Sequence, residues 1–148
     1  MPSRPRKLSD DDYRRLLEFR TAIRKFLAYS KNQAAKVDLT PTQHQLLLAI
    51  RGYTAPGEPT IGHVARCLLI RHHSAVELVD RAEAAGLVDR RTDPDDQRVV
   101  RLALTKSGAA KLERISRANL GEIGRLGPEF QDVWRAIERL APSPETIR

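Results

Sequence analysis

The hydrophobic residues of the chain recur at three- and four-residue steps, which is the spacing of amphipathic helices. The first helix begins at Ser9, an N-cap residue followed by aspartates that the positive end of a helix dipole favours, and extends to about Lys31 or a little beyond. Thr40 and Pro41 begin a second helix, which stops at Gly52. The apolar stripe of the first helix needs a packing partner.

Two short helices follow in succession. The first has the sequence TIGHVARCLL, and the second runs from Arg71 to Ala85 with apolar residues on one face and charged residues mostly on the other. Gly86 can take the positive φ that ends a helix.

The pattern then changes to that of a β-hairpin. Two short alternating or apolar runs, near Leu87–Arg91 and Val99–Leu104, flank the proline- and aspartate-rich turn TDPDDQ. Thr105 caps a fifth helix, which we expect Gly127 and Pro128 to break before a sixth. The tail APSPETIR is expected to fray.

Short helices followed by a charged hairpin, with long helices outside them, are the order of elements in a winged helix-turn-helix. We therefore predict a mainly α fold with a small β-hairpin wing. In it, N- and C-terminal helices flank a lobe whose fourth helix is the recognition helix. The length of 148 residues fits one domain.

The charge balance of the chain indicates what kind of partner it binds. The chain has 26 Lys and Arg against 19 Asp and Glu, a net charge of +7, which favours a polyanion such as double-stranded DNA. Solubility is the alternative explanation of the same excess. No apolar run approaches the roughly 20 residues that cross a bilayer, and no secretory signal is recognisable, so we expect a cytoplasmic protein without a membrane partner.

Residues able to carry catalysis are few and scattered. Cys67 has no disulfide partner and is expected to be a buried structural thiol, and the histidines lack zinc spacing, so no metal or cofactor is predicted. No nucleophile with a base and no carboxylate pair is recognisable, which argues against an enzyme. Glu77 and Asp80 are interpreted as solvated helix positions, or Asp80 as the partner of a nearby arginine.

The start of the fourth helix is the candidate DNA-reading site. Arg71 can pair with guanine O6 and N7, His72 and His73 can donate to phosphates or bases, and Ser74 can contact either. We include Glu77 in this DNA-facing set. A merely solvated helix start is the alternative interpretation.

Four arginines flank the acidic tip of the hairpin: Arg90, Arg91, Arg98 and Arg101. We expect Arg90, Arg91 and Arg98 to contact DNA. Asp96, with Asp93 as a second candidate, is expected to pair with a hairpin arginine and stiffen the turn. A calcium loop is the rival interpretation of DPDD, but the following glycine and the distant glutamate of an EF-hand are missing.

The stretches LTPTQHQLLLAI, TIGHVAR and SAVELVDRAEAAGLVDRRTDPDDQRVVRLALTKSG span Leu39 to Gly108 nearly continuously. They resemble the MarR family of bacterial regulators, which are dimeric winged-helix proteins that often repress nearby genes and release DNA on sensing a small ligand or an oxidant. Asp96-Gln97-Arg98 is similar to the family's Asp-x-Arg wing signature, and LTKSG to its LTxxG.

The resemblance implies a single MarR-type domain over residues 1–148. Residues 9–38 and 106–148 would be the dimerisation helices, and residues 39–105 the winged helix-turn-helix lobe. A homodimeric repressor on a pseudo-palindromic operator is the implied function, with Arg98 in the minor groove. A weakly specific chromosome-coating protein and a winged-helix protein-interaction module are the alternatives.

The resemblance also implies a pocket for a small aromatic or phenolic effector, between the dimerisation helices and the lobe. Its lining residues by location are Phe26, Tyr29, His44 and Tyr53, for each of which core packing is the alternative role. The peroxide-sensing cysteine that some members carry in the first helix has no counterpart here.

The turn before the recognition helix departs from the family, where it often reads Leu-Gly-Leu-Ser. Here Leu69 replaces the glycine and Arg71 replaces the capping serine. The helix start therefore loses a side-chain cap unless Ser74 supplies an acceptor. It gains a cation at the presumed DNA face, which a phosphate or a base would compensate.

Overall fold

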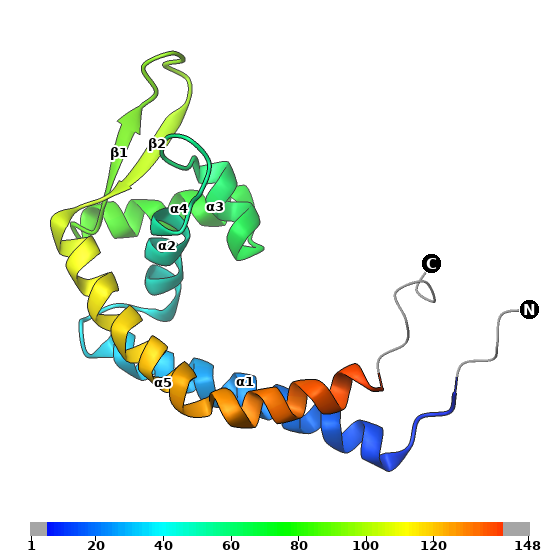
Figure 1. The fold of residues 1–148 in the computed structure, drawn as a ribbon. Helices are drawn as coiled ribbons and strands as arrows, with labels where there is room; N and C mark the ends of the chain where they lie inside the picture. Colours follow the sequence, from blue (N-terminus) through cyan, green and yellow to red (C-terminus); the bar gives the residue numbers. More distant parts are fainter. Residues whose placement is uncertain (1–5, 141–148) are drawn as a thin grey trace, which may run out of the picture. The chain divides into compact units, whose positions relative to one another are not determined.

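The computed structural model describes residues 6–140, which form five helices and one two-stranded antiparallel sheet (Figure 1). The elements are α1 (Asp10–Ala35), α2 (Pro41–Arg51), α3 (Ile61–Leu68), α4 (His72–Ala84), β1 (Val88–Thr92), β2 (Val100–Leu104) and α5 (Lys106–Glu138). The predicted mainly α fold with a hairpin wing is confirmed. The tail for which fraying is predicted lies outside the described residues.

The helix starts follow from local hydrogen bonds that the sequence encodes. Thr40 Oγ1 accepts from the backbone N–H of Gln43 while the Gln43 side chain accepts from the Thr40 N–H, which forms a complete capping box. The Ser9 N–H donates to Asp12, and the Asp12 N–H donates to Ser9 Oγ. Both predicted starts are confirmed.

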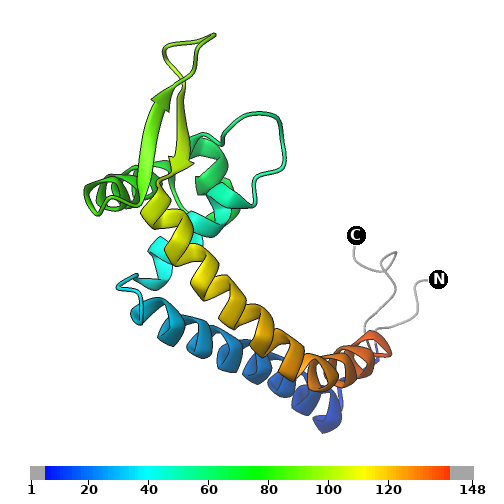
Figure 2. The same cartoon turned by 60° about the vertical axis from the view of Figure 1, so that its left-hand side comes forward.

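The C-terminal helix corrects one prediction, because α5 continues through Pro128 instead of breaking there. A proline inside a helix removes one backbone hydrogen bond and presses on the carbonyl four residues earlier. The segment beyond Pro128 nevertheless packs on α1, where the rings of Trp134 and Phe19 lie 6.0 Å apart. Figures 1 and 2 both show this half of α5 alongside α1. This packing favours one continuous helix.

The chain divides into two compact units, residues 6–29 with 120–140 and residues 30–119. The larger unit holds a core from α2, α3, α4, the hairpin and the first turns of α5. Its fully buried large side chains are Leu46, Leu47, Val64, Val79, Leu87, Val88, Leu102 and Ile115. The hairpin pairs Val88 with Leu104 and Thr92 with Val100. None of the described helices is long and apolar enough to cross a membrane.

Candidate nucleic-acid interface

The start of α4 presents its backbone N–H groups without a side-chain cap. Arg71 is the N-cap residue, with extended backbone angles, and its side chain makes no capping hydrogen bond. The predicted loss of the cap is confirmed, and Ser74 does not replace it. Arg71, His72 and His73 are exposed, and Ser74 is half-buried. This end of α4 therefore combines unpaired donors with cationic and neutral polar side chains, which suits an anion.

The opposite face of α4 anchors the helix in the lobe. Ala75, Leu78, Val79 and Ala82 are buried, whereas Glu77 is exposed. Gly86, just beyond the helix, has φ of 72°, as its predicted role requires. Because the buried stripe fixes the rotation of α4, the exposed residues at its start keep a defined direction.

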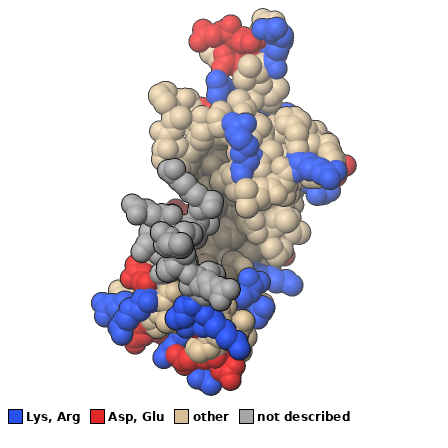
Figure 3. All heavy atoms as spheres, turned by 90° about the vertical axis from the view of Figure 1, so that its right-hand side faces the viewer, with Lys and Arg blue, Asp and Glu red and all other residues tan. Residues whose placement is uncertain are grey.

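The wing tip is held by Asp93. Its Oδ1 accepts from the backbone N–H groups of Asp95 and Asp96, and its Oδ2 accepts from Arg101 Nε at 2.9 Å. These backbone donors and the Arg101 guanidinium hold the pKa of Asp93 below its usual range. At the top of Figure 3, acidic and basic side chains lie together at this end of the hairpin.

Arg98, the arginine of the Asp-x-Arg signature, projects from the same turn. Its Nε donates to Asp96 Oδ1 at 3.1 Å, and the bond to Arg98 lowers the pKa of Asp96. The Arg98 side chain is nevertheless 91% exposed. Asp96 thus orients Arg98 without covering it, while the second aspartate candidate, Asp93, pairs with Arg101.

The arginines of β1 are engaged within the protein. Arg90 donates to Asp80 and Glu83 of α4, which confirms the interpretation of Asp80 as an arginine's partner. Arg91 donates to Glu58 at 2.7 Å and remains more than half exposed. The Glu58 partner, 33 residues away in the chain, carries no local sequence signal. Arg90 therefore ties the wing to α4.

The loop before α3 also holds the wing. Arg101 donates to the backbone oxygen of Glu58 at 2.9 Å, and the Leu102 N–H donates to the Pro59 oxygen at 2.9 Å. Thr60 forms a bridge with Arg101. The hairpin is thus fastened to α4 through Arg90 of β1, and to this loop through Arg91 of β1 and through β2.

The exit from β2 into α5 explains the glycine of LTKSG. Thr105 Oγ1 accepts from the Gly108 N–H at 3.0 Å and donates to the Gly86 oxygen at 2.7 Å. A Cβ on Gly108 would lie 2.2 Å from the Leu87 backbone oxygen. Only glycine allows this approach between the first turn of α5 and the start of the hairpin.

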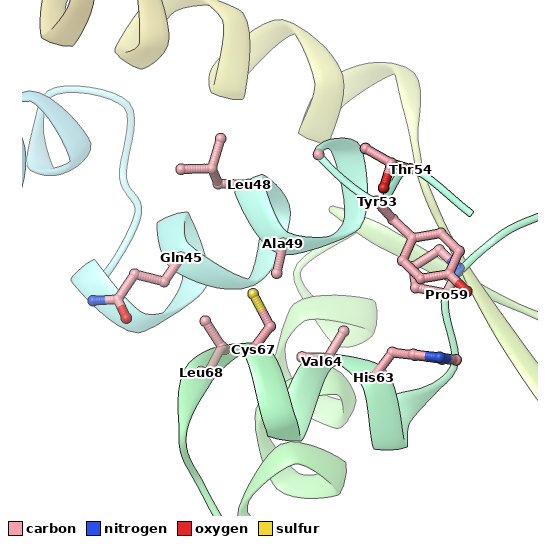
Figure 4. A pocket seen from close by; sticks show the side chains of 11 residues that line it. Gln45, Leu48, Ala49, Tyr53, Thr54, Pro59, His63, Val64, Cys67 and Leu68 are labelled. Atoms are coloured by element: carbon pink, nitrogen blue, oxygen red, sulfur yellow. The ribbon is translucent and has the colours of Figure 1, made fainter. Parts of the chain in front are cut away.

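Cys67 corrects a second prediction, because its side chain is exposed instead of buried. It lies on the side of α3 that faces a cavity of about 450 Å³ between α2 and α3 (Figure 4). Tyr53 and His63 also line this cavity, with ring centroids 5.0 Å apart. The apolar neighbours of Cys67 in sequence suggested burial, but Leu48 across the cavity is itself half exposed.

The four predicted pocket residues lie in different surroundings. Tyr53 lines the cavity beside α3, whereas His44 is buried and is not among that cavity's lining residues. Burial lowers the pKa of His44, since it disfavours the charged imidazolium. Phe26 and Tyr29 are half-buried on α1. Within residues 6–140, no group of three or more His, Cys, Asp or Glu side chains is arranged to hold a metal ion.

A sequence model of the MarR family matches residues 37–99, which contain α2 to α4, β1 and the wing tip. No curated protein matches the chain in sequence.

Among solved structures, a MarR family transcription regulator is 21% identical, with a TM-score of 0.72, 88% of this chain covered and 90% of that chain. RV1404 from Mycobacterium tuberculosis is 25% identical, with a TM-score of 0.69 and coverages of 97% and 99%. The transcriptional repressor CouR, bound to a 23-mer DNA duplex, is 24% identical, with a TM-score of 0.66 and coverages of 91% and 98%.

Proposed function

We propose that this protein, whose lobe is of the MarR family and whose fold is that of MarR family transcription regulators, binds a specific DNA operator as a homodimer and represses transcription. Two recognition helices about one helical turn apart, roughly 34 Å, would read a pseudo-palindromic site. Blocking of polymerase is the proposed mode of repression. The structure of CouR on a duplex supports DNA as the partner.

The observation that carries this proposal is the exposed, uncapped start of α4. Within the described part of the chain, Arg71 makes no ion pair, so its guanidinium is available to a guanine edge. His72, His73 and Ser74 stand beside free N–H groups that suit a phosphate. Glu77, exposed one turn later, can accept from a cytosine amino group.

The wing supplies the second contact. Arg98 is the arginine at the tip with the most exposed side chain, and a cation of this kind suits the negative potential of a narrow minor groove. Arg91 is placed to contact the phosphate backbone once Glu58 releases it. We propose that Arg90 contributes indirectly, by holding the wing on α4, although the sequence suggests it as a DNA contact.

Homodimerisation is supported by large apolar side chains exposed on α1 and on the second half of α5. They are Tyr13, Leu16, Leu17, Leu27, Leu120, Ile123 and Trp134. So many exposed apolar groups on two packed helices are typical of a surface that another protein covers. A second copy of the chain is the proposed cover, because a two-fold operator requires two lobes.

Release from DNA by a small aromatic or phenolic effector is the last part of the proposal. The cavity beside Tyr53 has a volume within the range of small-ligand sites and is lined mainly by apolar side chains. An effector would act only by binding better to the arrangement of lobes that does not fit DNA.

The deciding experiment is fluorescence anisotropy with DNA from upstream of the protein's own gene and with a scrambled duplex, at several salt concentrations. An operator-binding regulator should prefer the first by about a thousandfold at physiological salt. Arg71→Ala should cost about 1 to 3 kcal/mol at one base position and relax discrimination there. A chromosome-coating protein would instead bind both duplexes with equal affinity, and this affinity would fall steeply with salt. Arg71→Ala would then weaken binding to both duplexes equally.

A further inference from the structure

Leu69 ends α3 in a left-handed conformation. Its φ is 55° and its ψ is 40°, a region in which the Cβ of an L-residue crowds the backbone and which glycine occupies without strain. Leucine is neither glycine nor one of the short polar residues that tolerate this region. The sequence therefore places a strained residue where the turn would accept glycine.

The turn itself imposes this conformation. The Leu69 N–H donates to the Arg66 oxygen at 3.3 Å, and the Ile70 N–H donates to the Ala65 oxygen at 3.0 Å. These bonds close the end of α3 and do not involve the Leu69 side chain. A change of side chain at this position should leave the path of the backbone intact.

The Leu69 side chain itself contributes no packing that would offset the strain, since it is 92% exposed and takes no part in the core cluster. It is the most exposed large apolar side chain in the described part of the chain. A residue that is both strained and exposed gains nothing from the folded monomer. A partner that covers this side chain would supply the packing that the monomer lacks.

The charges around Leu69 indicate the chemistry of that partner. The stretch from Arg66 to Ser74, RCLLIRHHS, has no acidic residue, and Arg66, Arg71, His72 and His73 are exposed. Leu69 precedes the N-cap of α4 by two residues. An apolar side chain among cations at this place suits a polyanion that also offers an apolar group.

We propose that Leu69 is a specificity-determining residue that packs against the C5-methyl group of a thymine in the major groove of the operator. This methyl is the apolar group that DNA displays there, and it distinguishes thymine from the other bases. The packing of leucine in the complex then offsets the backbone strain that it causes in the free protein. The inference rests on the proposed function, because it requires an operator.

The first test removes only the methyl group. Each thymine of the operator is replaced in turn by uracil, and affinities are measured by anisotropy for the wild type, Leu69→Gly and Leu69→Ala. At one thymine of each half-site the wild type should lose about fourfold in affinity, the effect of one buried methyl group. Leu69→Gly and Leu69→Ala should each bind the operator with thymine and the operator with uracil at that position with equal affinity.

The second test uses the opposite effects of Leu69→Gly on stability and on binding. Glycine relieves the strain at φ 55°, so the thermal midpoint should rise, while operator affinity should fall severalfold. A misfolded variant would instead show a lower thermal midpoint as well as a lower operator affinity. Leu69→Ala keeps the strain, so it should lose operator affinity without gaining stability.

The outcomes separate this inference from the proposed function. If the wild type binds operator and scrambled duplex with equal affinity, the proposed function is wrong, and so is the proposed role of Leu69. In a second outcome the wild type prefers the operator, while uracil at every thymine lowers the affinity of Leu69→Gly as much as that of the wild type. In that case only the proposed role of Leu69 is wrong.

Discussion

Asp93 and Arg101 are joined across the base of the wing turn, where Arg101 Nε donates to Asp93 Oδ2 at 2.9 Å. The same carboxylate accepts two backbone N–H groups of the tip. One side chain thus sets both the shape of the turn and the position of the strand that carries Arg101. The acidic side chain of Asp93 at the wing tip therefore has a structural role.

Asp93→Ala should loosen the tip, because the turn loses its acceptor and Arg101 loses its partner. We expect faster amide hydrogen exchange for residues 93–99 and a lower thermal midpoint. Asp95→Ala is the control, since Asp95 takes part in this network only through its backbone N–H. Equal exchange in the two variants would contradict the role given to Asp93. Acid should loosen the wild-type tip in the same way, because the stabilisation is lost as pH falls from the ordinary aspartate pKa of about 3.9 through the lowered pKa of Asp93 in the fold.

Gly108→Ala should lower the free energy of unfolding by about 1–3 kcal/mol, because the new methyl group would overlap the Leu87 backbone oxygen. Gly121→Ala is the matched control in the same helix. No atom lies within 4 Å of its added Cβ, so it should stabilise by up to about 1 kcal/mol. Chemical denaturation of both variants measures the difference, and a neutral Gly108→Ala would mean that α5 can shift away from the hairpin.

The buried His44 should make stability depend on pH near neutrality. Because its pKa is lowered in the fold, the unfolded chain binds the proton more readily. The stabilisation is therefore present above the unfolded value of about 6.5 and is lost as pH falls below it. Urea denaturation at pH 7.5, 6.5 and 5.5 should show this loss.

In His44→Gln the free energy of unfolding should change less between pH 7.5 and pH 5.5. The exposed His73 offers the comparison, and His73→Gln should keep the wild-type slope. If the slope persists in His44→Gln, another group is responsible for it.

Leu120→Glu should disrupt the proposed homodimer while leaving the protomer folded, because Leu120 is 67% exposed on α5. Placing a charge in an apolar interface should raise the dimer dissociation constant by roughly 100-fold. Light scattering over a concentration series would measure it. Leu48→Glu, on the exposed side of α2, should leave the assembly unchanged. A wild type that is monomeric at micromolar concentration would remove the basis of this prediction.

Elements whose ends depend on neighbouring residues could be predicted from the sequence. Thr40 with Gln43, and Ser9 with Asp12, encode helix starts within four residues, and Gly86 and Thr105 mark the ends of the hairpin in the same way. The exposed set at the start of α4 could be placed because the helical period assigns its face. Whether those residues contact DNA stays a prediction.

Features that depend on distant residues could not be predicted. Pro128 signals a break by every local rule, but packing of the following segment keeps α5 helical. The pairing of Arg91 with Glu58 joins segments with no common local pattern. The exposure of Cys67 depends on the cavity between α2 and α3, which the apolar residues around it in sequence do not indicate.

The attachment of residues 58–60 to β2 also bears on how the protein behaves in a crowded solution. A two-stranded hairpin has two open edges, each able to recruit a strand from another molecule and to start aggregation. The backbone bond from Leu102 to Pro59 and the bridge between Arg101 and Thr60 cover part of one of these edges with the protein's own chain. The other edge carries Asp89, Arg90 and Arg91, whose charges disfavour a neighbouring strand. The wing can therefore extend from the lobe without serving as a template for fibrils.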